Sequence, residues 1–347
     1  MTRSTPSILV ALATVLGLAA AAGPATAQSS GERVVALDRA TPVREYAGWL
    51  LFSRWDGSAY RLATLHDGQV RDLPVPAQAE PFDADVGPDS AGRPSAVMSL
   101  CKGSCDLFVL GFEAGDELRP VRNANTNGKD ETDPSVWKGR LVFAREYATK
   151  LVPYTKRLKA PRSRPSDRLA SLPDKRCGAV DPPSCRPLED VDLVQMELYG
   201  DRIAQSWTYQ VDGFPGFRQN EVRLTNVKRT DTRQIAFMST GLSGGTYLGP
   251  SIDKGRVAFF RACQGDQSGC KTDNFGAIRY RISTGAYELA GARESWKAWA
   301  WSGSAGFHVP PACDDPGDDP DEAPTGACGI YRTPNLDWKP VDEERIR

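Results

Sequence analysis

The chain has 347 residues, of which 40% are hydrophobic and 25% charged, and its formal net charge is −1. This hydrophobic content suffices for a folded core, which excludes general disorder. A charge so near zero gives no overall attraction to nucleic acid, so we expect no nucleic-acid partner. The 32 glycines and 26 prolines favour many short strands joined by tight turns.

The first 27 residues are typical of a cleaved secretory signal. Arg3 precedes an apolar run at 8–22, and Ala25-Thr26-Ala27 matches a peptidase site. The alternative is an uncleaved anchor, but this run is near the lower limit for crossing about 30 Å of hydrocarbon. We therefore expect a secreted monomer, extracellular or associated with the cell envelope, without a membrane span, in which residues 28–347 form one domain.

A glycine followed by a short apolar run recurs six times between residues 48 and 307. The glycines are Gly48, Gly92, Gly139, Gly200, Gly255 and Gly303, at intervals of 44, 47, 61, 55 and 48 residues. Such intervals are typical of one four-stranded blade. We predict an all-β fold, a six-bladed β-propeller of four-stranded antiparallel blades. The expected blades are 42–75, 82–121, 133–160, 190–238, 246–290 and 296–342, with a basic insertion at 150–189.

The fifth repeat shows the four expected strands most clearly, at 247–252, 256–261, 278–282 and 287–289. In the sixth, a hairpin through Pro334 and Asn335 is expected to pair 330–332 with a strand near Trp338. Residues 33–37 would add a strand to the last blade and join the two ends of the chain. The alternative for this segment is a frayed terminus.

A strand, a short turn, Gly-Arg and an apolar strand, followed by a Tyr-Arg or Leu-Tyr type of strand, recur over most of residues 33–343. Asp106-Leu107-Phe108 and Gly329-Ile330-Tyr331 approximate the Asp-Ile-Tyr core of such repeats. The pattern resembles TolB-like six-bladed propellers and the related repeats of secreted actinobacterial proteins. The resemblance implies a binding scaffold and leaves the partner undefined.

Eight cysteines fall into four local pairs: Cys101 with Cys105, Cys177 with Cys185, Cys263 with Cys270, and Cys313 with Cys328. In an oxidising compartment these spacings favour disulfides that each close one loop. Eight cysteines allow 105 connectivities, and local pairing is favoured because a repeat contacts mainly its neighbours. A zinc site is the weaker alternative, since C-x2-C pairs are absent and the chain has only two histidines.

Between Cys313 and Cys328 lies an acidic loop whose carboxylates would suit calcium. Its aspartates are Asp314, Asp315, Asp318, Asp319 and Asp321. Interspersed prolines and the missing EF-hand spacing favour the alternative, a solvated acidic loop, so we expect no cofactor other than this calcium. The same question arises for Asn125, Asn127, Asp130, Glu131 and Asp133.

Nine Lys and Arg residues against two aspartates make the segment 150–176 strongly basic. Such a strip would suit a polyanion. The alternative interpretation is a mobile, hydrated excursion.

Trp296, Trp299 and Trp301 are concentrated near the start of the sixth repeat. In a strand, Trp299 and Trp301 share one face. If the strand is the innermost of its blade these side chains belong to the core, whereas an exposed pair would form a platform that stacks on sugars.

Gly241-Leu242-Ser243-Gly244-Gly245 matches a hydrolase elbow, and Asp253 or Asp273 followed by His308 gives the chain order of a triad. The residues after Ser243 indicate a loop and a strand rather than the required helix, so we assign no catalytic residue.

The sequence therefore favours a non-catalytic binding protein that recognises an extracellular protein or a cell-wall polymer through loops at one rim. The alternative is an extracellular hydrolase or lyase with a site at the mouth of the central channel, and a third is a structural envelope component. An enzyme requires two or three titratable side chains gathered at one mouth.

Overall fold

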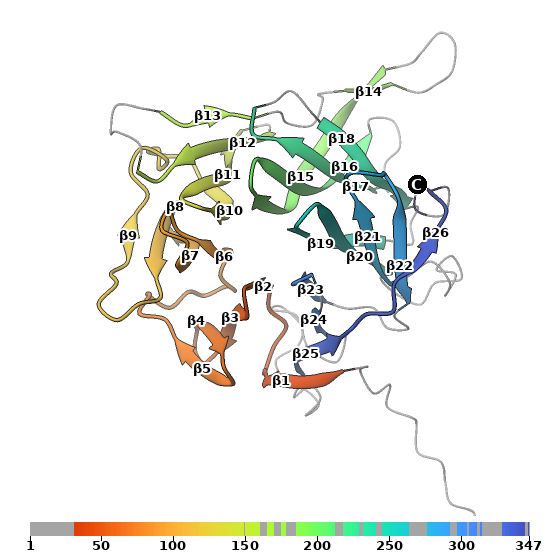
Figure 1. The fold of residues 1–347 in the computed structure, drawn as a ribbon. Coiled ribbons are helices and arrows are strands. Elements are labelled where there is room, and N and C mark those ends of the chain that lie inside the picture. Colours follow the sequence, from red (N-terminus) through yellow and green to blue (C-terminus); the bar gives the residue numbers. More distant parts are fainter. Residues whose placement is uncertain are drawn as a thin grey trace, which may run out of the picture.

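The computed structural model describes residues 31–148, 150–159, 165–169, 175–177, 185–211, 218–228, 232–240, 245–263, 276–291, 297–303, 305–310, 313, 328–343 and 346. Six antiparallel sheets stand around a central channel (Figure 1). Four sheets have four strands and two have five. The predicted six-bladed β-propeller is confirmed.

The first three blades each contain four consecutive strands, given from the channel outward. Blade 1 has β2 (Val43–Tyr46), β3 (Trp49–Trp55), β4 (Tyr60–His66) and β5 (Gln69–Asp72); blade 2 has β6 (Ala84–Pro88), β7 (Pro94–Lys102), β8 (Ser104–Gly111) and β9 (Arg119–Pro120); blade 3 has β10 (Glu131–Trp137), β11 (Arg140–Tyr147), β12 (Lys150–Arg157) and β13 (Asp167–Arg168).

Blade 4 has five consecutive strands, whereas blades 5 and 6 each include one strand from elsewhere in the chain. Blade 4 has β14 (Lys175–Cys177), β15 (Cys185–Tyr199), β16 (Arg202–Val211), β17 (Arg218–Asn226) and β18 (Thr232–Thr240); blade 5 has β19 (Gly245–Asp253), β20 (Arg256–Cys263), β21 (Gly276–Arg281), β22 (Tyr287–Gly291) and β26 (Lys339–Val341); blade 6 has β23 (Ala298–Trp301), β24 (Ala305–Val309), β25 (Gly329–Pro334) and β1 (Glu32–Ala36).

The six recurring glycines share one structural position, the turn between the first and second strand of a blade. All six have positive φ, with values of 86, 85, 71, 65, 84 and 78° in chain order. Glycine adopts this conformation without a steric penalty. In blades 1, 3 and 5 the residue before the glycine also has positive φ, which matches the type I′ turn of a two-residue hairpin. The repeat seen in the sequence is therefore the repeat of this turn.

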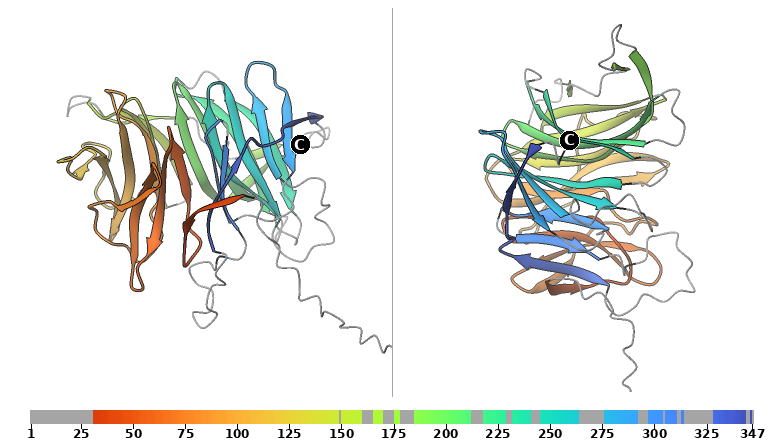
Figure 2. Two further views of the ribbon diagram at one scale, coloured as in Figure 1. Left: turned by 60° about the horizontal axis from the view of Figure 1, so that its bottom comes forward. Right: turned by 90° about the vertical axis from the view of Figure 1, so that its right-hand side faces the viewer.

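Six apolar clusters fill the six spaces between neighbouring blades. Strand β20 shows how one strand serves two of them: Val257 and Phe259 face blade 4, whereas Ala258 and Phe260 face blade 6. Successive side chains of a strand point to opposite faces, so a run of apolar residues is expected where both faces are buried. Neighbouring sheets lie side by side around the ring (Figure 2), and β23 contacts β2 to close it.

Residues near both ends of the described chain complete blades to which they are not adjacent in sequence. Strand β1 pairs with β25 as the outermost strand of blade 6, which confirms the closure expected for residues 33–37. The strand expected near Trp338 is present, but its predicted pairing with residues 330–332 is wrong. Residues Lys339–Val341 form β26, which pairs with β22 of blade 5 because β1 already occupies the edge of β25.

Blade 3 corrects the interpretation of the basic segment as an excursion. Strand β12 pairs with β11 over its whole length, from Tyr147 opposite Lys150 to Arg140 opposite Arg157. Asp167 and Arg168 then form the outer strand β13. The basic side chains of 150–157 therefore stand on a regular strand, whose apolar positions, such as Val152, are buried.

The inner strands are joined by hydrogen bonds that we call inter-blade ties. In each tie a backbone N–H of one inner strand donates to a side-chain oxygen of the inner strand before it. The ties run from Val136 to Asp85 (3.2 Å), Leu198 to Ser135 (2.8 Å), Ile252 to Glu197 (3.0 Å) and Trp301 to Ser251 (3.1 Å). They link blades 2 to 6 in succession and satisfy buried N–H groups that no strand pairing reaches.

Among the described residues, no helix is long and apolar enough to cross a membrane. The predicted signal at 1–27 lies outside the described residues.

Candidate functional site

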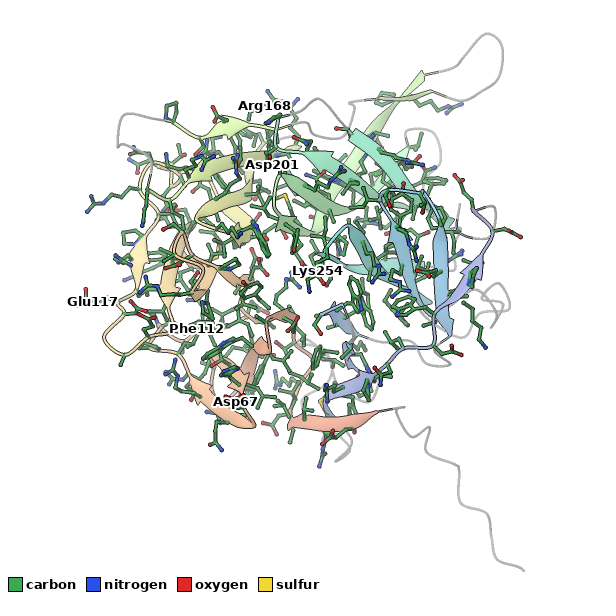
Figure 3. All side chains as sticks on the ribbon, viewed as in Figure 1. Asp67, Phe112, Glu117, Arg168, Asp201 and Lys254 are labelled. Atoms are coloured by element: carbon green, nitrogen blue, oxygen red, sulfur yellow. A yellow bond between two sulfur atoms is a disulfide. The ribbon has the colours of Figure 1, made fainter. Side chains whose placement is uncertain are left out.

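The last residues of the inner strands and several of the glycine turns gather at one end of the channel, which we call the turn mouth. It contains a cavity of about 840 Å³. Lys254, in the turn after β19, lies near the ring axis (Figure 3). The charged residues of the lining are Glu45, Asp67, Asp85, Glu197, Asp253, Lys254 and Arg332. Five carboxylates thus accompany two cations, which makes the mouth negatively charged when all of them are ionised.

Three aromatic residues, Tyr46, Trp137 and Tyr199, form a group at this mouth that we call the aromatic trio. They are the last residues of β2, β10 and β15, in blades 1, 3 and 4. The Tyr46 and Trp137 ring centroids are 5.7 Å apart at 89°, and those of Trp137 and Tyr199 are 3.9 Å apart at 37°. Because blade 2 separates blade 1 from blade 3, the first contact reaches past the end of blade 2 at the mouth.

Blade 2 makes room for that contact with a glycine. A Cβ on Gly87 would overlap the backbone carbonyl oxygen of Val136, the residue before Trp137. Any other residue at position 87 would push the end of β10 away from the mouth, because a backbone carbonyl cannot move as a flexible side chain can.

Glu45 lies beside the trio and is the residue there with the clearest capacity to exchange a proton. Burial, the largest cause, raises its pKa to about 7; the Gly48 N–H, which donates to Oε1 at 2.7 Å, lowers it, and the charge of Asp253 raises it. The pKa of Tyr46 is also raised, by burial and then by Tyr199 and Glu45. Glu45 is therefore partly protonated near neutral pH.

Deeper in the channel, Arg44 is surrounded by Asp83, Asp85, Asp133 and Glu197. Burial is the largest cause of a raised pKa in all four carboxylates, and Arg44 lowers the pKa of each. The pKa of Asp83 rises to about 6. Arg44 Nε is 4.0 Å from Asp85 Oδ1 and, among the described residues, has no hydrogen-bond partner. One guanidinium cannot neutralise four carboxylates, so protons supply the rest of the charge balance.

The opposite end of the channel, which we call the far mouth, is smaller, at about 350 Å³. Arg44, Asp83 and Asp133 line it, together with Thr41, Phe82 and Lys297. Asp83 accepts a hydrogen bond from the backbone N–H of Asp133 at 2.6 Å, so this carboxylate joins blade 2 to blade 3.

The turn mouth can therefore pack an apolar group against aromatic rings, accept hydrogen bonds and exchange a proton at Glu45. Within the described part of the chain, no three His, Cys, Asp or Glu side chains form a group that could hold a metal ion.

Of the two interpretations that the sequence left open for Trp299 and Trp301, the structure shows the core and not the exposed sugar platform, although Trp301 also borders the turn mouth. Their side chains are 1% and 3% exposed and belong to the core between blades 5 and 6. They lie on β23, the innermost strand of its blade, where both faces pack against neighbours. Trp296 lies outside the described residues.

The acidic loop predicted to bind calcium, with Asp314, Asp315, Asp318, Asp319 and Asp321, lies outside the described residues.

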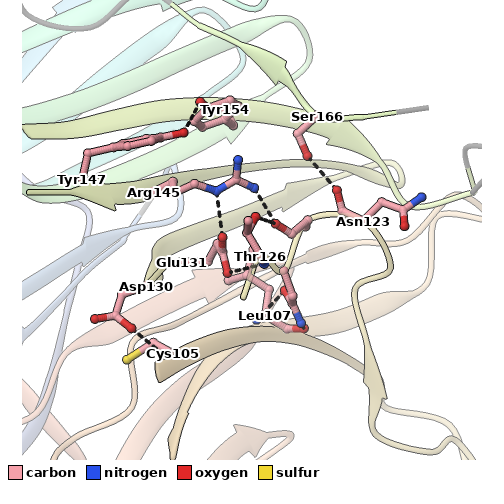
Figure 4. A network of polar contacts seen from close by, with 12 residues as sticks. Cys105, Leu107, Asn123, Thr126, Asp130, Glu131, Arg145, Tyr147, Tyr154 and Ser166 are labelled. Carbon is pink, nitrogen blue, oxygen red and sulfur yellow. Dashed lines mark hydrogen bonds and ion pairs between the residues drawn. The ribbon is translucent and has the colours of Figure 1, made fainter. Parts of the chain in front are cut away.

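The second calcium candidate, around Asn125 to Asp133, is a structural network instead (Figure 4). Glu131 is fully buried and accepts a hydrogen bond from Arg145 Nε at 2.7 Å. The side-chain amide of Asn125 both accepts from and donates to the backbone of Leu107, at 2.9 and 3.1 Å. These oxygens hold the loop between blades 2 and 3 and are already occupied.

Two of the four predicted disulfides are present in the described residues, Cys101–Cys105 and Cys313–Cys328. They are consistent with an extracytoplasmic location. Cys177 and Cys185 lie opposite each other in the β14–β15 ladder. Cys270 lies outside the described residues, so its pairing with Cys263 stays a prediction.

The triad considered in the sequence is not assembled in what the structure describes. Ser243 and Asp273 lie outside the described residues. His308 is fully buried in β24, its ring stacks on Tyr331, and burial lowers its pKa to about 4. It does not line the turn mouth, where Asp253 lies.

Sequence reasoning missed the aromatic trio. A signal was available, because Tyr46 and Trp137 each stand two residues before a recurring glycine and Tyr199 stands directly before one. Only the register of that turn shows that positions 46, 137 and 199 share one mouth.

No family model matches the sequence, and no curated protein is similar to it. Among solved structures, TolB from Acinetobacter baumannii is 12% identical with a TM-score of 0.46, over 85% of this chain and 66% of that one, just under two thirds of its length. The match to a Nidogen/Laminin complex has 8% sequence identity and a TM-score of 0.45, and it covers 80% of this chain and 84% of that one. The match to the α-L-arabinofuranosidase Arb93A from Fusarium graminearum has 10% sequence identity and a TM-score of 0.48, and it covers 88% of this chain and 98% of that one. These distant likenesses concern the fold alone.

Proposed function

We propose that this protein is a secreted, non-catalytic binding protein that takes a segment of an extracellular cell-wall polymer at the turn mouth. The aromatic trio is the observation that supports it. Three partly exposed rings from three blades meet beside carboxylates that accept hydrogen bonds. Ligand sites commonly combine aromatic walls with a few fixed polar groups in this way. A resemblance to TolB, which the sequence suggested, would agree with a binding role.

Structural hydrogen bonds favour binding over catalysis. Glu45 is held by the Gly48 N–H, Asp85 by the Val136 N–H and Glu197 by the Ile252 N–H. A carboxylate that already accepts a backbone hydrogen bond is fixed in place, which suits recognition of a ligand.

An extracellular glycan hydrolase is the second candidate, because Glu45 and Asp253 lie at the same mouth and the pKa of Glu45 is about 7. A carboxylic acid with a pKa near the working pH can serve as a general acid. Incubation with cell-wall glycans and measurement of new reducing ends tests this candidate. Release that depends on Glu45 would replace binding as the function.

Co-sedimentation of the purified protein with isolated cell walls tests the binding proposal. We expect Trp137→Ala to lower the bound fraction at least about tenfold, because it removes the central ring of the trio. Trp55→Ala is the matched control: Trp55 is also partly buried, but it lies under Arg39 at the end of β3 that is farthest from the Gly48 turn and the mouth.

Equal loss in the two tryptophan variants would indicate a general structural effect, and unchanged binding by Trp137→Ala would contradict a site at the turn mouth. Binding to extracellular proteins instead of walls, still lost in Trp137→Ala, would keep the site and replace the ligand class.

A further inference from the structure

We propose that the ligand group held at the turn mouth is an ammonium cation, such as an alkylammonium or a protonated amino sugar. The inference rests on the proposed function and adds the charge of the ligand. It is supported by the aromatic trio, by the carboxylates of the same cavity, and by the places of the cations that the chain itself supplies.

The first argument is the wall of the cavity. The faces of Tyr and Trp rings carry negative electrostatic potential, and ammonium groups bind against such faces in aromatic cages. Tyr46 and Trp137 stand nearly perpendicular, at 89°, so the trio presents rings in more than one plane. A neutral apolar group would gain the same packing, so the wall alone does not decide the charge.

The charged residues that line the cavity decide whether the ligand group is a cation. Glu45 and Asp253 lie on the inner strands β2 and β19 of blades 1 and 5, on either side of blade 6, close enough for Asp253 to raise the pKa of Glu45. Among the described residues, no ion pair within 4.0 Å joins either carboxylate to Lys254 or Arg332, the two cations of this cavity. Burial without a close cation is unfavourable for a carboxylate, and a ligand cation would remove that cost.

The rest of the lining adds negative charge. Asp85 and Glu197 reach the cavity from β6 and β15, and Asp67 reaches it from the turn between β4 and β5. Asp85 and Glu197 share the positive charge of Arg44 with Asp83 and Asp133 of the far mouth. A cation entering the turn mouth therefore meets a field that the protein has left only partly compensated.

Choline and 3,3-dimethylbutan-1-ol form a matched pair of probes, since the second replaces the charged nitrogen of choline with carbon and keeps its shape. Titration calorimetry at pH 8 should show choline binding at least about tenfold more tightly than the alcohol. The charge of choline does not change with pH. Its affinity should therefore rise about tenfold from pH 6 to pH 8 as Glu45 loses its proton.

Glu45→Gln keeps the oxygen that accepts the Gly48 N–H and removes the charge, so it should fold normally. We expect this variant to bind choline about tenfold more weakly at pH 8 and to show a smaller rise in affinity from pH 6 to pH 8. The control is Glu117→Gln, on an exposed residue at the outer edge of the ring (Figure 3), which should bind choline as the unmodified protein does.

Equal affinity for choline and the neutral alcohol would overturn the ammonium proposal and leave a ligand site at the mouth intact. If the protein bound cell walls through Trp137 but did not bind choline, the ammonium proposal would also be overturned and the ligand site would remain. Failure of the walls and of both probes would overturn the ammonium proposal and the proposed function together.

Discussion

The two mouths of the channel contain the same kind of residue in different situations. At the far mouth, carboxylates surround Arg44, and Asp83 bonds the backbone of the neighbouring blade. At the turn mouth, Glu45 and Asp253 form no ion pair within 4.0 Å in the described part of the chain, and three aromatic rings line the same cavity. Asp83 of the far mouth thus joins two blades, as Asp85 and Glu197 do through the inter-blade ties. Among the described residues, Glu45 and Asp253 make no such tie, and they line the mouth where we propose that the ligand binds.

Of the substitutions that test this difference between the two mouths, Arg44→Ala should change the stability of the fold most. At pH 8 it should lower the free energy of unfolding by about 3–5 kcal/mol, because several buried carboxylates lose their shared cation. At pH 5 the loss should be smaller, since those acids are then more protonated. Urea unfolding at both pH values measures the difference.

The matched control for Arg44 is Lys254→Ala at the turn mouth, which should change stability by less than about 0.5 kcal/mol. An equal cost of Arg44→Ala at pH 5 and pH 8 would show that packing, rather than charge, is what Arg44 contributes.

Ser135→Ala should have the second largest effect and lower the free energy of unfolding by about 1–3 kcal/mol. It removes the side-chain oxygen that accepts the buried N–H of Leu198 in the tie between blades 3 and 4. Denaturant unfolding measures the loss, and Ser283→Ala, on an exposed turn, is the control. If Ser135→Ala left stability unchanged, the inter-blade ties would have no energetic role.

Glu45→Gln should have the smallest effect on the free energy of unfolding, and it should stabilise the fold where the other substitutions destabilise it. The folded pKa of about 7 lies above the ordinary value of 4.5, so Glu45 destabilises the fold increasingly as pH rises from about 4.5 to about 7. At pH 8 the variant should be more stable by about 1 kcal/mol, or about 2–4 °C in melting temperature. Calorimetry at pH 4, where Glu45 is mostly protonated in both the folded and the unfolded protein, should show little difference.

For the unmodified protein the channel acids predict a melting temperature that rises as pH falls from 8 to 6. His308 acts in the other direction, because its folded pKa of about 4 lies below the ordinary 6.5 and its stabilisation is lost as pH falls between these values. A melting temperature that fell steadily from pH 8 to 6 would contradict the raised pKa of the channel acids.

Much of the fold could be predicted because its signals are local. Each blade is a meander of neighbouring strands, and the turn after its first strand needs positive φ, which the recurring glycines reveal. Predictions failed where a partner is distant in sequence. Nothing near residues 339–341 shows that β1 already occupies the edge of β25, and the basic residues of 150–157 conceal the period-two pattern of a strand.

The sequence by itself determined six sheets, their turns and the closing strand, because each depends on residues within one repeat or on the need to cover an end. Tertiary structure alone decided which side chains meet in the channel. All six blades contribute residues to the turn mouth, and these residues lie far apart in the sequence. Their convergence depends on the common axis that closure of the ring creates, and the same closure buried Trp299 and Trp301 while leaving the aromatic trio at the mouth.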